Sequence, residues 1–97
     1  MTDTTPSLED IRSQIDRIDC QIIGLIAERQ GWVVEAGKLK KDEAGVRAPA
    51  RVEQVITKVR ELAIQQGASP DVVEKAYRAL IAGFIEFELE VHRNKGN

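Results

Sequence analysis

The feature of the sequence that most constrains its fold is a long amphipathic pattern, which no proline interrupts between Leu8 and Lys41. Apolar residues recur along it with alternating spacings of four and three, at Ile11, Ile15, Ile18, Ile22 and Leu25. The same series continues through Arg29, Trp32, Ala36 and Leu39. This spacing places the series on one face of an α-helix. It therefore predicts one helix, capped by Ser7 and running to about Lys41.

Two further helices are predicted after a break at residues 42–49, whose sequence DEAGVRAP contains glycine and proline. The second helix starts near Pro49 and stops at Gly67, and the third opens at Ser69-Pro70-Asp71. Their expected apolar faces are Val52, Val55, Ile56, Val59, Leu62 and Ala63, then Val73, Tyr77, Leu80, Ile81, Phe84, Phe87 and Val91. With a disordered tail at 1–7 and a frayed end at 94–97, the sequence predicts one all-α domain of three helices over residues 1–97.

The length of the first helix predicts a dimer. A helix of about 33 residues is about 50 Å long, whereas a compact domain of about 100 residues has a radius of gyration of only about 13 Å. One chain cannot cover such a helix, so part of its apolar face would stay exposed. We therefore expect an intertwined homodimer in which the long helices pair. The alternative is a monomeric bundle with a bent or frayed first helix.

Composition and charge exclude several classes of function. The net charge is −2, so no basic surface indicates binding to nucleic acid or to a membrane. The start of the chain is polar and acidic, unlike a signal peptide, and no apolar run is long enough to span a bilayer. A single cysteine fits a reducing compartment, so we expect a cytoplasmic protein. With one cysteine and one histidine, we expect no metal site and no cofactor, and His92, placed in the frayed tail, makes a catalytic triad improbable.

Four charged residues occupy unusual positions in this pattern. Arg29 interrupts the apolar series of the first helix, and a buried guanidinium needs an anionic partner. Lys40 follows eleven residues later, so on one helix the two would point to the same side, about 16 Å apart. Together the two could bind a small anion. Alternatively, Arg29 pairs with a carboxylate of the core and Lys40 is solvated. Arg12 is about 25 Å before Arg29 on the helix, so it is either a surface residue near the helix start or enters the site of a partner subunit. Glu88 lies at the edge of the third helix's apolar face. It is either a residue of the site or a carboxylate at the rim of the core that pairs with Arg or Lys.

Three sequence motifs resemble those of the all-helical chorismate mutases, and the resemblance covers nearly the whole chain. They are Ile-Arg at residues 11–12, Leu-Ile-Ala-Glu-Arg at 25–29 and Gly-Lys-x-Lys at 37–40, followed by VRAPARVEQV at 46–55. The resemblance implies an intertwined dimer of three-helix chains. By position, Arg29 and Lys40 match the residues that hold the substrate carboxylates and ether oxygen, and Arg12 matches an arginine from the other subunit. Arg51 matches a cation at the pocket edge, and Glu88 lies where glutamine or glutamate faces the ether oxygen.

The reaction that the resemblance implies is the pericyclic rearrangement of chorismate to prephenate, which needs no nucleophile. The enzyme must hold a reactive conformer and stabilise negative charge on the ether oxygen. Lys40 can donate one contact to that oxygen, and Glu88 can donate another only as a neutral acid. We therefore expect kcat/KM to fall as rising pH removes the Glu88 proton.

Some positions depart from the pattern of the family. Val52 stands where many mutases carry a glutamate, Phe84 replaces a small polar residue, and Ala48 replaces an acidic one. A related branch, the isochorismate-pyruvate lyases, has a similarly apolar site, but it typically carries glutamine at the position of Glu88, which favours the mutase reading. An amino-substituted chorismate is a further possible substrate.

The alternative from a different class is a non-catalytic helical dimerisation module, which would leave Arg29 and Lys40 unexplained.

Overall fold

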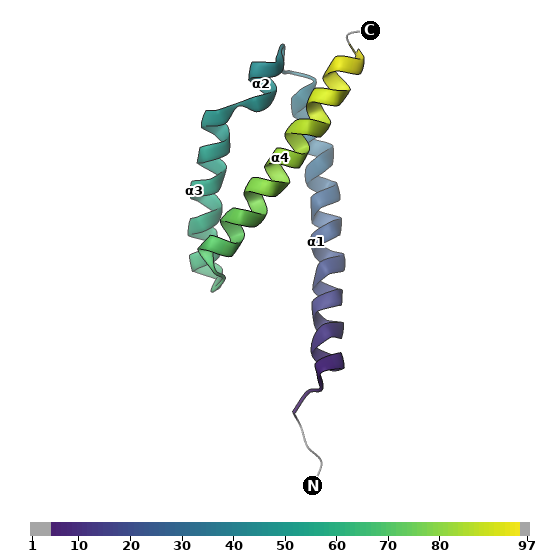
Figure 1. The fold of residues 1–97 in the computed structure, drawn as a ribbon, viewed down its shortest axis with the longest axis vertical. Coiled ribbons are helices and arrows are strands. Elements are labelled where there is room, and N and C mark those ends of the chain that lie inside the picture. Colours follow the sequence, from purple (N-terminus) through teal and green to yellow (C-terminus); the bar gives the residue numbers. More distant parts are fainter. Residues whose placement is uncertain (1–4, 96–97) are drawn as a thin grey trace. The chain divides into compact units, whose positions relative to one another are not determined.

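The structure, a computed structural model, describes the backbone of residues 5–95 and the side chains up to Asn94. Its helices are α1 (Leu8–Gly37), α2 (Glu43–Arg47), α3 (Pro49–Gln66) and α4 (Pro70–Lys95) (Figure 1). The predicted all-α class with three long helices is confirmed, and α2 is an additional short helix in the segment that we read as a break. The parts of the predicted tails at 1–4 and 96–97 lie outside the described residues.

Helix α1 begins where the sequence predicted and ends earlier. The Ser7 hydroxyl accepts a hydrogen bond from Asp10 N–H, and Ser7 N–H donates to the Asp10 carboxylate, each at 3.1 Å, which is a capping box. The second bond lowers the pKa of Asp10. At the other end, the bonds Leu39 N–H to Ala36 C=O and Lys40 N–H to Gly37 C=O tighten the chain into a turn. The prediction of a helix to about Lys41 is therefore wrong, and Lys40 lies in the connection to α2.

Internal contacts divide the chain into two units that meet between Trp32 and Val33. In the first unit, most of the large apolar residues of α1 are exposed, and no residue of this helix is fully buried. The exposed residues are Leu8, Ile11, Ile15, Ile18, Ile22, Ile23, Leu25 and Trp32. The apolar face is thus present as predicted, and its large side chains are exposed.

The second unit has a small core in which α4 packs on α3 and on α2. Its buried apolar residues are Val46, Ile56, Val59, Ala63, Ile81 and Leu89. Four of them belong to the predicted faces of the second and third helices. Val46 and Leu89 were not predicted, because Val46 lies in the segment assigned to a break and Leu89 lies beside the expected face of α4.

Left-handed backbone conformations and side-chain caps set the corners of this unit. Gly67, with φ 77°, ends α3, and its N–H bonds to the carbonyls of Ala63 and Ile64. Ser69 then caps α4, because its hydroxyl accepts the Val72 N–H at 3.3 Å. Ala48 also has a positive φ of 35°, a strained value for a residue with a Cβ, between α2 and α3.

Ion pairs join the outer faces of α3 and α4. Arg78 of α4 donates two hydrogen bonds of 3.0 Å to Glu53 of α3 and one of 2.8 Å to Glu74. Arg60 of α3 reaches Asp71 and Glu74 at 3.1 and 2.9 Å. Hydrogen bonds from Arg78 hold the pKa values of Glu53 and Glu74 below the usual range of glutamate and raise the pKa of Arg78. The network is exposed, so each pair contributes little by itself.

None of the helices in the described part of the chain has both the length and the hydropathy required to cross a membrane.

Candidate functional site

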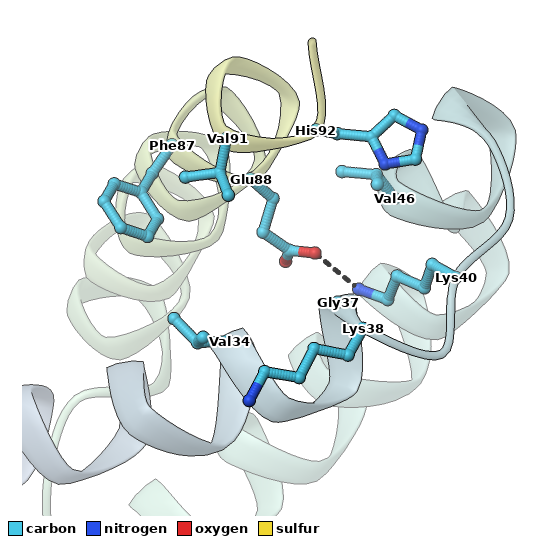
Figure 2. Close-up of a pocket in the computed structure, with 9 residues that line it drawn as sticks. All are labelled: Val34, Gly37, Lys38, Lys40, Val46, Phe87, Glu88, Val91 and His92. Carbon is cyan, nitrogen blue, oxygen red and sulfur yellow. Dashed lines mark hydrogen bonds and ion pairs between the residues drawn. The ribbon is translucent and has the colours of Figure 1, made fainter. Parts of the chain in front are cut away.

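A cavity of about 280 Å³ lies within the second unit, where the end of α1, the connection after it, α2 and α4 meet (Figure 2). Its volume is near the lower end of the range for small-molecule sites, about 300 Å³. Nine residues line it: Val34, Gly37, Lys38, Lys40, Val46, Phe87, Glu88, Val91 and His92. The wall thus combines apolar side chains with four that carry or can carry a charge.

The central polar contact of the cavity joins Lys40 to Glu88. Lys40 Nζ donates to Glu88 Oε2 at 2.9 Å. The Lys40 side chain is 26% exposed and the Glu88 side chain only 9% exposed. Because a carboxylate removed from water needs a partner, the lysine satisfies a requirement of the fold as well as of the site. The sequence left open whether Lys40 is solvated and whether Glu88 pairs with a cation. The contact shows that Lys40 is bonded to Glu88, so the interpretation of a merely solvated lysine is wrong.

The rest of the wall is mostly apolar. Val34 of α1, Val46 of α2, and Phe87 and Val91 of α4 surround the ion pair (Figure 2). The Phe87 ring also packs edge to face against the ring of Phe84 at a centroid distance of 6.5 Å. Apolar surroundings strengthen electrostatic interactions at the polar end of the cavity. The arrangement can therefore hold a small, partly apolar anion and stabilise negative charge that develops beside Lys40.

The local structure explains why Lys40 reaches Glu88. The chain leaves α1 at Gly37, which lies against Glu88: a Cβ added at this glycine would meet Oε2 at 3.4 Å, an ordinary van der Waals contact. Two residues after Lys40, the Asp42 carboxylate caps α2 by accepting the Gly45 N–H at 2.9 Å. The connection is thus fixed at both ends, and the lysine is held between them.

The other predicted site residues are placed separately. Arg51 lies exposed in the first turn of α3, Val52 is half-buried beside it, and Phe84 is half-buried in α4. None of these three belongs to the nine residues that line the described cavity. Arg12 and Arg29 belong to the first unit, where Arg12 is exposed and Arg29 half-buried. Their roles, and their convergence with Lys40, stay predictions.

Sequence reasoning missed several residues of the cavity, above all His92. We placed this residue in a frayed tail, but α4 extends through it to Lys95. A signal was available, because His92 follows Glu88 by four residues and therefore shares its helix face. Val46 had a weaker signal, the acid pair Asp42-Glu43 that opens a short helix.

Comparison with known proteins gives a family match and two relatives. The family described as chorismate mutase type II matches residues 11–89, which is more than half of the chain. An isochorismate pyruvate lyase from Pseudomonas aeruginosa is 31% identical over 86 residues, which cover 89% of this chain and 85% of the lyase. The T-protein of Haemophilus influenzae is 34% identical over 73 residues, which cover 74% of this chain and only 19% of that protein. The resemblance inferred from the sequence motifs is therefore confirmed, and the chain belongs to the type II chorismate mutase family.

Proposed function

We propose that the chain is a chorismate mutase that rearranges chorismate to prephenate in the cavity built around Lys40 and Glu88. The observation that carries the proposal is the Lys40–Glu88 contact of 2.9 Å in a pocket whose other lining residues are mostly apolar. It supplies a cation and an acid side by side, and neither is a nucleophile activated by a general base. Such a pair suits a reaction in which the protein stabilises developing charge and forms no covalent bond to the substrate.

In this mechanism the ether oxygen of the substrate binds between Lys40 and Glu88. As its C–O bond breaks and the new C–C bond forms, the oxygen gathers negative charge, and the Lys40 ammonium stabilises it by a charge-assisted hydrogen bond. Glu88, the carboxylate partner of Lys40 in the free protein, takes up a proton from solvent as the substrate binds and donates a second hydrogen bond, because an ionised carboxylate would repel the oxygen. The apolar wall holds the substrate in a compact, reactive conformer and excludes water. A millionfold acceleration would need about 8 kcal/mol from these effects together.

We further propose that the active form is a homodimer in which α1 pairs with its copy. The exposed apolar series of α1 supports this, because such a face is costly in water. Arg29 would then hold a substrate carboxylate, and Arg12 would enter the site of the partner. Arg51, Val52 and Phe84 would border the substrate in that assembly. We propose the cytoplasm as the compartment, since the chain has a single cysteine.

The second candidate is an isochorismate-pyruvate lyase, which makes salicylate and pyruvate. It is favoured by the 31% identity to such a lyase over most of both chains. Val52 and Phe84 also make the expected substrate environment more apolar than in many mutases. The same lysine would stabilise the same departing oxygen, so the Lys40 contact by itself does not select between the two reactions.

The test is to incubate the protein separately with chorismate and with isochorismate and to identify the products. Prephenate from chorismate at a kcat/KM above that for isochorismate supports the mutase, and salicylate with pyruvate as the faster products supports the lyase. A Lys40→Met variant should lose either activity. The control is Lys58→Met, which removes an exposed lysine of α3 outside the cavity. Turnover of neither substrate by the folded protein would contradict both proposals and leave a dimerisation module.

A further inference from the structure

His92 is the cavity residue to which the mechanism gives no task. It lines the cavity together with Glu88 and stands four residues, about 6 Å, further along α4. Figure 2 shows its imidazole extending from α4 toward Val46 of α2. The residue is half-buried and lies inside the helix. Its ring is therefore a fixed part of the wall.

The hydrogen-bonding capacity of His92 is unused in the described structure. Glu88 and Lys40 bond to each other, and Lys38 bonds to Glu35 at 2.9 Å on the exposed side. By contrast, the His92 imidazole has no hydrogen bond or ion pair with the described residues. A half-buried imidazole that lines a cavity of ligand size is available to a polar group of a ligand.

The charges around His92 favour an anion at this place. Its charged neighbours come from the connection after α1, from α2 and from α4, and they are Lys38, Lys40, Glu43, Glu88 and Arg93. The two acids in this set are already paired, Glu88 with Lys40 at 2.9 Å and Glu43 with Arg93 at 3.2 Å. An imidazolium at residue 92 would thus add a positive charge that no described carboxylate neutralises.

Resting on the proposed function, we propose that His92 is a substrate-binding residue that, as an imidazolium, holds a carboxylate of the ring diacid at the α2 end of the cavity. Glu88 and His92 lie four residues apart on α4 and line the same cavity, so one ring diacid bound there would contact both side chains. The contact exists equally in the substrate and in the transition state. It therefore lowers KM and leaves kcat nearly unchanged.

Kinetic tests use two variants of His92. His92→Leu removes the donor and should raise KM about tenfold to a hundredfold while kcat changes less than about threefold. His92→Gln keeps a neutral donor and should recover part of the affinity. In the wild type, KM should be higher in alkaline than in acidic buffer, and this difference should be absent in His92→Gln. Asn94→Leu is the matched control, since this exposed residue of the same turn lies outside the cavity.

A binding test does not depend on any reaction. His92 is the only histidine of the chain, so its imidazole Cε1–H resonance is assigned without ambiguity. The wild type is titrated with acid in the absence and presence of isophthalate, a stable ring dicarboxylate. If the imidazolium form binds the diacid about tenfold more tightly, the titration midpoint rises by about one pH unit. His92→Leu should bind isophthalate about tenfold more weakly than Asn94→Leu does.

The outcomes separate this proposal from the proposed function. A protein that turns over neither substrate, while isophthalate still shifts the His92 resonance, would contradict the enzymatic activity and keep the anion contact. An unchanged KM and isophthalate affinity in His92→Leu would overturn the contact. A loss of kcat at constant KM would also overturn it, because the residue would then act in the chemical step.

Discussion

At the scale of single residues, Lys40 and Glu88 connect stability with the proposed chemistry. The carboxylate is 9% exposed, so the contact that supports the mechanism also neutralises a nearly buried charge. A substitution at either residue changes both properties, and experiments must separate them. The two predictions at this scale are designed for that purpose.

The first prediction concerns the proton of Glu88. In the wild type, kcat at saturating substrate should fall as rising pH removes this proton, since only the neutral acid donates to the ether oxygen. Glu88→Gln keeps a neutral donor at all pH values and should give a flat profile. Measurement of kcat separates this effect from that of His92, which acts on KM. An unchanged pH profile in Glu88→Gln would remove Glu88 from the proposed role.

The second prediction concerns the charge of Lys40. Lys40→Gln should lower kcat by about a hundredfold to a thousandfold, the usual effect of losing one donor to a developing oxyanion. It should also lower the free energy of unfolding by about 1–3 kcal/mol, because Glu88 loses its partner. The double variant Lys40→Gln with Glu88→Gln should regain stability without regaining kcat. Denaturant unfolding and steady-state kinetics on all three variants test this, and joint recovery of both properties would argue against a chemical role.

The sequence predicted the residue types of the site better than their arrangement. Lys40 and Glu88 were identified because charges stood at unusual positions in an apolar pattern. Their contact was not predicted as such, because Lys40 was placed on a continuous helix. His92 was missed, since a position near the end of a chain says little about whether the helix reaches it. Arg12 and Arg29 lie in a different unit from the cavity, so their part in the site stays a prediction.

At the scale of helices, the ends were predictable where a local signal fixes the backbone. Ser7, Pro49, Gly67 and Ser69-Pro70 marked the ends that the structure has. The end of α1 had no comparable signal, because Gly37 is followed by residues that would also fit a helix. Tertiary packing settles it, since Lys40 bonds to Glu88 and Val46 is buried in α2. These contacts form between segments far apart in sequence, which periodicity does not register.

Two substitutions should test the left-handed residues at the ends of α3 with opposite results. Gly67→Ala should destabilise the protein by about 1 kcal/mol, because it forces a Cβ into a backbone with φ 77°. Ala48→Gly should stabilise it by about 0.5 kcal/mol, because relief of strain at φ 35° exceeds the added entropy of glycine. Thermal unfolding of both variants checks the pair. Ala50→Gly, at the second residue of α3, is the control and should only destabilise.

The ion pairs between α3 and α4 predict a pH dependence of stability. The pKa values of Glu53 and Glu74 are lower in the folded chain than in the unfolded one. Their contribution is therefore present above the ordinary glutamate pKa of about 4.3 and is lost as the pH falls through the lower folded values. Arg78→Met should lower Tm at pH 7 and make Tm less sensitive to acid. A Lys75→Met control, which leaves these pairs intact, should keep the acid sensitivity of the wild type.

At the scale of the whole molecule, the main feature that requires a partner is the apolar face of α1, whose large side chains are exposed to water. Eight large apolar residues between Leu8 and Trp32 are exposed, although their spacing is typical of a helix that packs against another. The sequence predicted this exposed apolar face from the length of the helix and its apolar series. Its proposed resolution, a second copy of the chain, depends on contacts between chains, which one chain cannot display.

Charge substitutions on α1 test the dimer. Ile18→Glu should give monomers and abolish activity, because it places a carboxylate in the apolar series and removes the site that two copies would share. Ser13→Glu adds the same charge on the opposite face and should change neither the mass in solution nor the activity. Sedimentation equilibrium and product formation check both variants. An active monomeric Ile18→Glu protein would contradict the dimer proposal.

Mixing of variants tests whether Arg12 acts in the partner's site. Arg12→Ala and Lys40→Met should each be inactive alone. When the two are unfolded, mixed equally and refolded, half of the dimers are hybrids with one intact site, so roughly a quarter of the wild-type activity should return. Failure to recover activity in confirmed hybrids would place Arg12 outside the partner's site.

The connection between Gly37 and Asp42 limits how this region can evolve. Both of its ends are fixed, by the last turn of α1 and by the cap of α2, and Lys40 lies between them. One inserted or deleted residue would displace the backbone by about 3.5 Å. A shift of that size would separate Lys40 Nζ from Glu88 Oε2, which are 2.9 Å apart. Functional homologues should therefore keep the length of this segment together with Lys40 and Asp42, while its other residues can vary.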